Sequence, residues 1–146
     1  ASRGIGRAIA RRLAADGARV AVLDLDPDGA ATTAGSIRAA GGSAAPFVAD
    51  IADFAAVGEA VAAIEAELGP VAILVNNAGW DRVEPFVDNT PELWDRLIDI
   101  NLRGAIHATR ATLDGMIAVG AGKIVFIGSD AARVGSTGEA VYAACK

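Results

Sequence analysis

Short apolar runs alternate with longer segments of helical spacing along this chain. The apolar runs cover residues 19–23, 45–48, 71–75 and 123–127, and none of them alternates regularly with polar residues. Continuous apolar runs of this length are typical of strands whose two faces are both covered in a parallel sheet. The pattern therefore predicts four such strands.

The segments between these strands carry the punctuation of helix ends. The first helix is expected over about 5–16, before Gly17, and the second from Pro27 to the Gly41-Gly42 pair. A third is expected over about 53–68. Strands that alternate with helices in this way predict an α/β protein with a parallel sheet.

The fourth helix is predicted to be long and uninterrupted. It begins after Thr90, whose hydroxyl suits an N-cap, and continues to about Val119. Its inward face is read from the large aliphatic side chains at helical spacing, which are Leu93, Leu97, Ile100, Ile106 and Leu113. A fifth helix is expected to start near Glu139.

Composition limits the classes of partner. The 146 residues are 53% hydrophobic and 21% charged with a net charge of -5, so no general attraction to nucleic acid or anionic lipid is expected. One cysteine and one histidine cannot build a disulfide or a histidine metal cluster. No apolar run reaches the roughly 18 residues of a membrane helix. A cytoplasmic protein without metal, membrane or nucleic-acid partners is expected.

The chain opens on a glycine turn that leads directly into a helix. Ser2, Arg3, Gly4, Ile5 and Gly6 form this turn. Glycines let backbone approach a ligand closely, and a helix N-terminus attracts a pyrophosphate. A strand and then Asp24 follow, at the place where a dinucleotide-binding fold puts a carboxylate on the adenosine ribose. The carboxylate would repel a 2′-phosphate and favours NAD over NADP, although Arg3 points weakly the other way.

Taken in order, these residues resemble the short-chain dehydrogenase/reductase family. That family's turn reads Thr-Gly-x-x-x-Gly-x-Gly, and Gly4 and Gly6 match its later glycines. Further matches are Asp50-Ile51, Asn76-Asn77-Ala78-Gly79, Asn101, Ser129 and Tyr142-x-x-x-Lys146. The resemblance covers the whole chain and implies a doubly wound Rossmann fold, in which residues 1–146 form a partial NAD(P)-binding domain.

The resemblance also implies the role of each matched residue. Tyr142 would be the acid/base of a secondary alcohol and ketone interconversion, since Lys146, four residues on, shares its helix face and its ammonium favours a phenolate. Lys146 would also bind the nicotinamide ribose, Ser129 the reacting oxygen, and Asn101 a water that relays protons. Asp50 and Ile51 would contact adenine, while Asn76, Asn77, Ala78 and Gly79 would lie under the two riboses.

Two loops bear on the substrate. The loop that starts at Trp80 and the loop over 129–135 resemble those of 2-hydroxycyclohexanecarboxyl-CoA dehydrogenases, which implies NAD-linked oxidation of a cyclic β-hydroxyacyl-CoA. Trp80 could form an apolar wall beside the ring of the substrate, and Arg82 or Arg133 could bind a CoA phosphate. A 3-oxoacyl-(acyl-carrier-protein) reductase-like enzyme and a non-catalytic dinucleotide-sensing module stay open as alternatives.

The resemblance sets two expectations about the whole protein. In the dinucleotide-binding strand order 3-2-1-4-5-6, the central strand would precede Ala1, so the strands at 19–23 and 71–75 should lack their shared neighbour. The chain would also stop before the remaining strands and the substrate lid, and alone it is expected to be inactive. Family members form dimers or tetramers, and the same is expected of the parent protein.

Overall fold

The computed structural model describes all of residues 1–146 as an α/β protein with four parallel-paired strands. The first half contains α1 (Gly4–Ala15), β1 (Arg19–Asp24), α2 (Pro27–Ala39), β2 (Ser43–Val48) and α3 (Phe54–Leu68). The second half contains β3 (Ile73–Asn76), α4 (Pro91–Ile98), α5 (Gly104–Val119), β4 (Lys123–Phe126), α6 (Ala131–Val134) and α7 (Ala140–Cys145). The four predicted strands and the first three predicted helices are confirmed to within a few residues.

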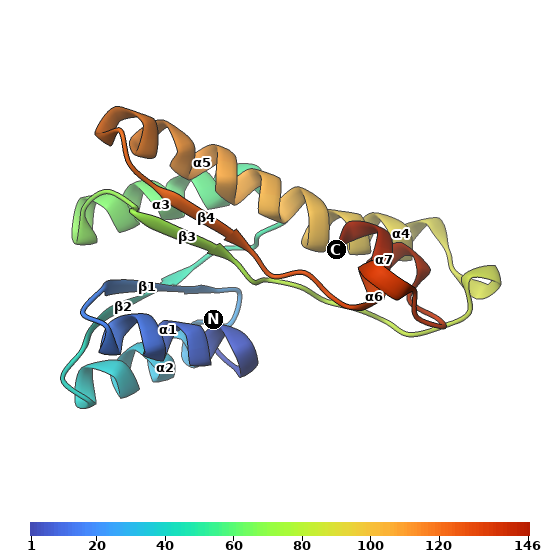
Figure 1. Cartoon of the computed structure of the whole chain (residues 1–146), viewed down its shortest axis with the longest axis horizontal. Coiled ribbons are helices and arrows are strands. Elements are labelled where there is room, and N and C mark those ends of the chain that lie inside the picture. The colour runs from blue at the N-terminus through green and yellow to red at the C-terminus, as the bar shows by residue number, and fades with distance from the viewer.

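The strands form two separate pairs (Figure 1). β1 pairs in parallel with β2, and β3 pairs in parallel with β4. No ladder joins β1 to β3, as the sequence predicted for two strands without a shared neighbour. Each strand is connected to its partner through a helix, which parallel pairing requires.

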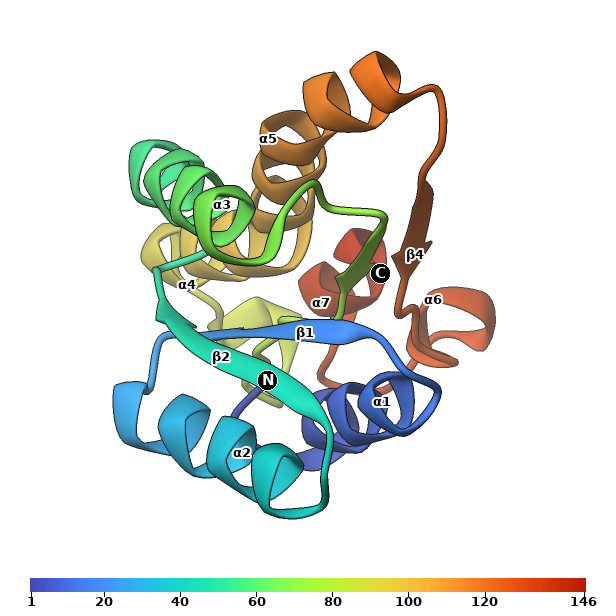
Figure 2. The ribbon, with the colours of Figure 1, turned by 90° about the vertical axis from the view of Figure 1, so that its left-hand side faces the viewer.

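Helices cover both strand pairs. Figure 2 shows α1 and α2 on one side of the β1–β2 pair and α3 on the other, while α5 packs beside α3. The core between α1, α2 and the first pair is built mainly from small side chains, which are Ala10, Ala14, Val20, Val22, Ala30, Ala34, Ile37 and Ala44. Small side chains let the helix axes approach the sheet closely.

The predicted long helix is interrupted, and this corrects one expectation. A π-helical turn over Asp99–Arg103 separates α4 from α5, and the Gly104 N–H donates to the Asp99 carbonyl, five residues back. Leu93 and Leu97 are buried as predicted, but Ile106 is 55% exposed and Leu113 36% exposed. The buried face of α5 consists instead of Gly104, Ala108, Thr112 and Met116. The prediction was wrong there because it followed the large aliphatic residues and assumed an unbroken α-helical period.

No helix is both long and apolar enough to cross a membrane.

Candidate active site and family

The predicted site residues gather where the strands end. Asp24 is the last residue of β1, Asp50 and Ile51 follow β2, Asn76 ends β3, and Ser129 follows β4. The carboxyl ends of parallel strands lie at one edge of a sheet, and this edge is where open α/β sheets bind ligands. The fold therefore places the predicted residues in two neighbouring groups along that edge.

The glycine turn is tied to the end of β1 by Asp24. Asp24 Oδ2 accepts hydrogen bonds from the ammonium group of Ala1, the first residue of the sequence, at 2.5 Å and from the Ser2 N–H at 2.7 Å. Burial by itself would raise the pKa of Asp24, but the bond from this ammonium, the bonds from the Ser2 and Asp26 N–H groups and the ammonium charge outweigh burial and hold it far below its usual range. Asp24 is therefore an anion at neutral pH, beside the start of α1.

Two residues that sequence reasoning missed support the same turn. The Arg7 guanidinium and the Thr33 hydroxyl both donate to the carbonyl oxygen of Ser2, from Arg7 Nε at 2.9 Å and from Thr33 Oγ1 at 3.2 Å. Thr33 is only 1% exposed. A threonine at a buried helical position needs a partner, but the burial of Thr33 is known only from the structure. The two bonds join the turn to α1 and α2.

The region around this turn fits the pyrophosphate and ribose of a dinucleotide. Side chains cap the N-termini of α2, α3 and α4, through Asp26, Asp53 and Thr90, whereas Arg3 makes no capping bond to α1. The first N–H groups of α1 are thus available to an anion. Gly4 has φ +54°, and a Cβ built there would meet nothing within 4 Å. A pocket of about 360 Å³ adjoins the turn, lined by Ser2, Arg3, Asp24, Leu25 and Asp26.

The glycine turn also meets the loop that follows β3. A Cβ added to Gly6 would lie 2.8 Å from Asn77 Nδ2 and 3.2 Å from Ala1 Cα. Asn76 Nδ2, one residue earlier, donates to Thr109 Oγ1 on α5 at 3.3 Å. The structure thus brings the glycine turn and the Asn76–Gly79 segment together.

Asn101 sits inside the π turn and binds the loop after β3. Its Oδ1 accepts from Trp80 N at 3.1 Å, and its Nδ2 donates to Trp80 O at 2.7 Å and to Leu97 O at 3.0 Å. The residue is 5% exposed. Asn101 is thus a buried polar residue whose side chain binds the backbone of this loop, and its role with a relay water stays a prediction.

Truncation of Asn101 is expected to destabilise the protein. Asn101→Ala removes three hydrogen bonds and leaves the backbone of Trp80 short of partners, so we expect the free energy of unfolding to fall by about 2 kcal/mol. Urea unfolding of the full-length protein measures this loss. Asn89→Ala is the matched control, because Asn89 makes its bonds to Glu84 and Pro85 at a more exposed position. Equal losses in the two variants would contradict the prediction.

The Lys146 side chain also lies close to the loop that follows β3. A Cβ added to Gly79 would lie 3.0 Å from both Asn101 Oδ1 and Lys146 Nζ, and Lys146 Nζ donates to Ile127 O at 3.3 Å. Burial lowers the pKa of Lys146, which makes its ammonium a readier proton donor. Its Nζ lies 5.8 Å from the centroid of the Tyr142 ring, on the same side of α7. Tyr142, Lys146, Asn101 and Gly79 therefore share one small region.

Ser129 lies next to this region but is engaged locally. Its Oγ accepts from Ala131 N at 3.2 Å and so helps to start α6. It makes no hydrogen bond to Tyr142 in this structure. Its neighbour Gly128 faces the carbonyl of Lys146, with a Cβ position 3.7 Å from that oxygen. The position of Ser129 relative to the phenol thus depends on the loop between β4 and α7.

Two carboxyl groups meet beside this loop, and the sequence did not pair them. Burial, and then the neighbouring Glu139 carboxyl, raise the pKa of Asp81. Asp81 Oδ1 is buried without a hydrogen-bond partner. The same two loops are joined by the Glu84 N–H, which donates to Gly138 O at 3.0 Å. Asp81 and Glu139 therefore lie where these two loops join, and protonation of Asp81 removes the repulsion between their carboxylates.

This pair predicts a pH dependence of stability. Because the pKa of Asp81 is raised on folding, the folded state holds its proton more tightly, and the stabilisation is lost as pH rises through the folded value. Asp81→Asn mimics the protonated form, so its melting temperature relative to wild type is expected to rise as the pH increases above the usual range of a carboxyl group. Asp130→Asn, at an exposed carboxylate paired with Arg133, is the control. Parallel pH profiles for wild type and Asp81→Asn would refute the prediction.

Comparison with known proteins identifies the family. The sequence model described as "short chain dehydrogenase" matches residues 1–146. The 2,3-dihydro-2,3-dihydroxybenzoate dehydrogenase of Bacillus subtilis is 40% identical over 146 residues, which are 100% of this chain and 56% of that protein. The 3-oxoacyl-(acyl-carrier-protein) reductase FabG of Escherichia coli is 37% identical over 146 residues, 100% of this chain and 59% of that protein.

A solved structure shows the same fold. The gluconate 5-dehydrogenase of Burkholderia cenocepacia, in complex with NADP and tartrate, superposes with a TM-score of 0.94 at 39% identity, covering 99% of this chain and 57% of that one. The chain spans little more than half the length of the relatives it matches. The family model matches the whole length of this chain, and the chain shares the Rossmann fold of this solved relative. The chain therefore belongs to the short-chain dehydrogenase/reductase family, whose members are oxidoreductases that act on alcohols and ketones.

Proposed function

We propose that the parent protein interconverts a secondary alcohol and a ketone with NAD, and that Tyr142 is the acid/base. The observation that carries this proposal is the convergence of Lys146 Nζ and Asn101 Oδ1 on Gly79, each 3.0 Å from its Cβ position, beside the Tyr142 ring. A bound nicotinamide dinucleotide would supply the hydride acceptor. Tyr142 would take the proton of the substrate hydroxyl, and the Lys146 ammonium would favour the phenolate form.

The other residues of the site would orient the substrate and the cofactor and stabilise the charge that develops on the reacting oxygen. We assign Ser129 Oγ to the reacting oxygen, where a hydroxyl donor stabilises developing negative charge. Asn101 would hold the loop under the substrate, since its side chain binds both backbone polar groups of Trp80. We assign Asn76, Asn77, Ala78 and Gly79 to the riboses and Asp50 and Ile51 to the adenine, at the edge where these segments lie.

The preference for NAD rests on Asp24. Its carboxylate is an anion at neutral pH and lines the pocket next to the glycine turn. A 2′-phosphate in this pocket would meet that charge. The gluconate 5-dehydrogenase structure contains NADP, and this favours the phosphorylated cofactor by analogy. We give the local charge more weight, because like charges at close range exclude a ligand whereas similarity of fold does not select one.

For the substrate we propose a cyclic β-hydroxyacyl-CoA. The support is the resemblance of the Trp80 loop and of residues 129–135 to enzymes of that specificity. In the structure the Arg96 guanidinium covers one face of Trp80, 4.1 Å from the ring centroid. Arg82 is paired with Glu84 at 3.0 Å and Arg133 with Asp130 at 3.3 Å, so each arginine would have to exchange partners to bind a CoA phosphate. Surface pairs of this kind cost little to exchange.

Two alternatives have specific support. A 3-oxoacyl-(acyl-carrier-protein) reductase-like activity is supported by the similarity to the Escherichia coli reductase. A dinucleotide-sensing module would need the pocket at the glycine turn but not the region around Tyr142 and Lys146. Because Lys146 and Asn101 lie close to Gly79 beside the Tyr142 ring in that second region, we favour the enzyme.

A steady-state assay of the full-length protein tests the proposal. The substrates are 2-hydroxycyclohexanecarboxyl-CoA and 3-hydroxybutyryl-CoA, each with NAD and with NADP, and turnover of at least the cyclic thioester with NAD preferred is expected. Preference for NADP would contradict the cofactor assignment. Failure to turn over either thioester, with activity on an acyl-carrier-protein thioester, would favour the alternative enzyme.

We also propose that the parent protein is a homodimer or homotetramer. Four large apolar side chains lie exposed along the π turn and α5, which are Leu102, Ile106, Leu113 and Ile117. A contiguous apolar stripe on a helix is typical of a helix-to-helix contact between subunits. Sedimentation of the full-length protein as a monomer at micromolar concentration would contradict this proposal.

A further inference from the structure

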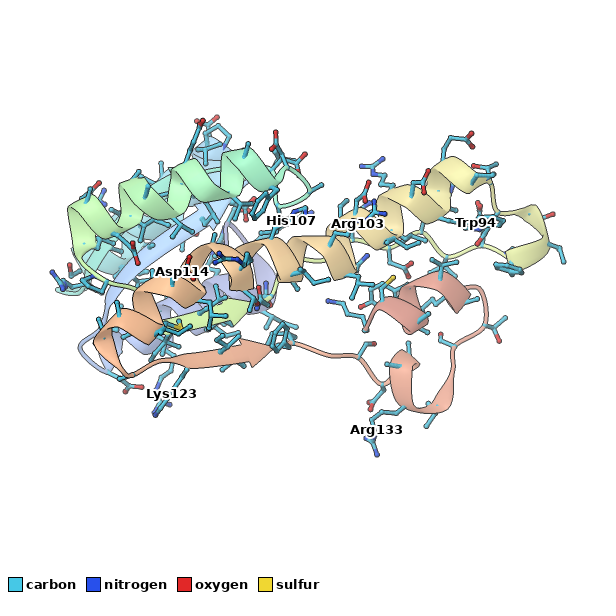
Figure 3. All side chains as sticks on the ribbon, turned by 90° about the horizontal axis from the view of Figure 1, so that it is seen from above. Trp94, Arg103, His107, Asp114, Lys123 and Arg133 are labelled. Carbon is cyan, nitrogen blue, oxygen red and sulfur yellow. The ribbon has the colours of Figure 1, made fainter.

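The only histidine of the chain lies away from Tyr142 and contacts the segment after β2. His107 is on α5, and its Nδ1 lies 3.1 Å from the carbonyl oxygen of Ile51. A carbonyl only accepts hydrogen bonds, so Nδ1 carries the proton and His107 is the donor. Figure 3 shows His107 directed from α5 toward the start of α3.

The segment that receives this bond is a tight turn. Asp50 Oδ1 accepts from Ala52 N at 2.9 Å, and Asp50 O accepts from Asp53 N at 3.1 Å. These bonds shape the turn locally but do not anchor it to another element. The bond from His107 spans 56 positions of sequence and ties the turn to α5.

Packing around the bond leaves the turn little freedom. A Cβ added to Gly104 would lie 2.7 Å from Ile51 Cγ1, so α5 and the Ile51 side chain are in the closest contact that a glycine allows. The Phe54 ring stands 5.3 Å from the imidazole, centroid to centroid, at an interplanar angle of 51°. Ile51 also packs against the small core cluster of Val57, Val61 and Ala108. The Ile51 backbone and side chain are thus both positioned from α5.

We propose that His107 is a positioning residue for the adenosine half of the dinucleotide. The inference rests on the proposed function, which assigns Asp50 and Ile51 to the adenine. By donating Nδ1–H to Ile51 O, His107 holds these two residues in their binding arrangement before the cofactor arrives. A site ordered in advance has less conformational entropy to lose on binding, so its ligand binds more tightly.

The test compares cofactors that contain or lack adenosine. His107→Leu in the full-length protein removes the donor while keeping an apolar side chain beside Phe54. We expect the Kd for NADH to rise roughly threefold to tenfold, the effect of one net hydrogen bond. The Kd for reduced nicotinamide mononucleotide, which has no adenosine, is expected to change less than about twofold. A change of this size is what a surface substitution usually causes. Both constants are read from nicotinamide fluorescence, independently of turnover.

Two further variants make the result specific. His107→Gln retains an N–H donor and is expected to recover part of the lost NADH affinity. Arg110→Leu is the matched control, because Arg110 lies one turn further along α5 with its side chain on the surface, paired with Asp114 at 2.8 Å. Its NADH affinity is expected to equal that of wild type.

The outcomes separate this inference from the proposed function. Equal weakening of both ligands in His107→Leu, or unchanged NADH affinity in that variant, would overturn the role of His107 alone. Failure of the wild-type protein to bind NADH or NADPH at all would overturn the proposed function and this inference with it.

Discussion

Tyr142→Phe is expected to lower kcat by roughly 1000-fold while leaving cofactor affinity almost unchanged. The substitution removes one hydroxyl from α7, and general acid/base groups contribute on the order of 100-fold to 10,000-fold to a rate. The phenyl ring that remains can still pack next to Lys146, whose Nζ bond to Ile127 O does not involve the phenol. The measurement is kcat with the thioester substrate, paired with the Kd for NADH.

The control for this variant lies on the same helix. Ala144→Ser adds a hydroxyl at an exposed position of α7, two residues from Tyr142. Its turnover is expected to stay within about threefold of wild type, since surface substitutions cost little. If Tyr142→Phe kept full turnover, the acid/base assignment would be wrong. If wild type had no turnover with any alcohol yet bound NADH, the sensing alternative would be favoured.

The second large effect concerns the choice of cofactor. Asp24→Asn keeps an oxygen acceptor for the Ala1 and Ser2 nitrogens but removes the charge that faces the pocket. At an effective dielectric constant of about 20, repulsion between a carboxylate and a phosphate amounts to a few kcal/mol. We expect the ratio of kcat/KM for NAD to that for NADP to fall roughly 100-fold, which corresponds to about 2.7 kcal/mol.

Asp28→Asn tests whether the effect is local. Asp28 lies in the first turn of α2, is exposed, and does not line the pocket, but its substitution changes the net charge by the same amount. The cofactor ratio of this control is expected to stay within about threefold of wild type, because solvent and salt screen an exposed charge. An unchanged ratio in Asp24→Asn would show that Asp24 does not select the cofactor.

The sequence predicted where the helices begin and end better than it predicted which side of a helix is buried. Caps and breakers such as Pro27, Thr90 and Gly69 are local signals, and the helices begin and end beside them. The buried face of α5 depended on the π turn, which no local signal marked. Large aliphatic residues such as Ile106 suggested a core position, although the surface stripe they form had the same helical spacing.

For the candidate site, the order of the motifs along the chain indicated which residues belong to it, but the sequence did not indicate which hydrogen bonds they make. The matched motifs indicated which residues follow which strand, and in the structure Asn101 Oδ1 and Lys146 Nζ lie close to Gly79. The contact of Thr33 with Ser2 spans 31 positions of sequence, and that of His107 with Ile51 spans 56. Such tertiary hydrogen bonds leave no periodic trace in a single sequence, so they became visible only in three dimensions.

The π turn has a consequence for how this family member can vary in length. Loss of one residue between Ile98 and Gly104 would restore a regular α-helix, and the faces of α4 and α5 would keep nearly the same directions, because a π turn holds one extra residue in a wider turn. The change would fall on the turn itself, where the Asn101 side chain binds the backbone of Trp80. Insertions and deletions should therefore be absent from this short segment, whereas the exposed loop over 82–89 can accept them.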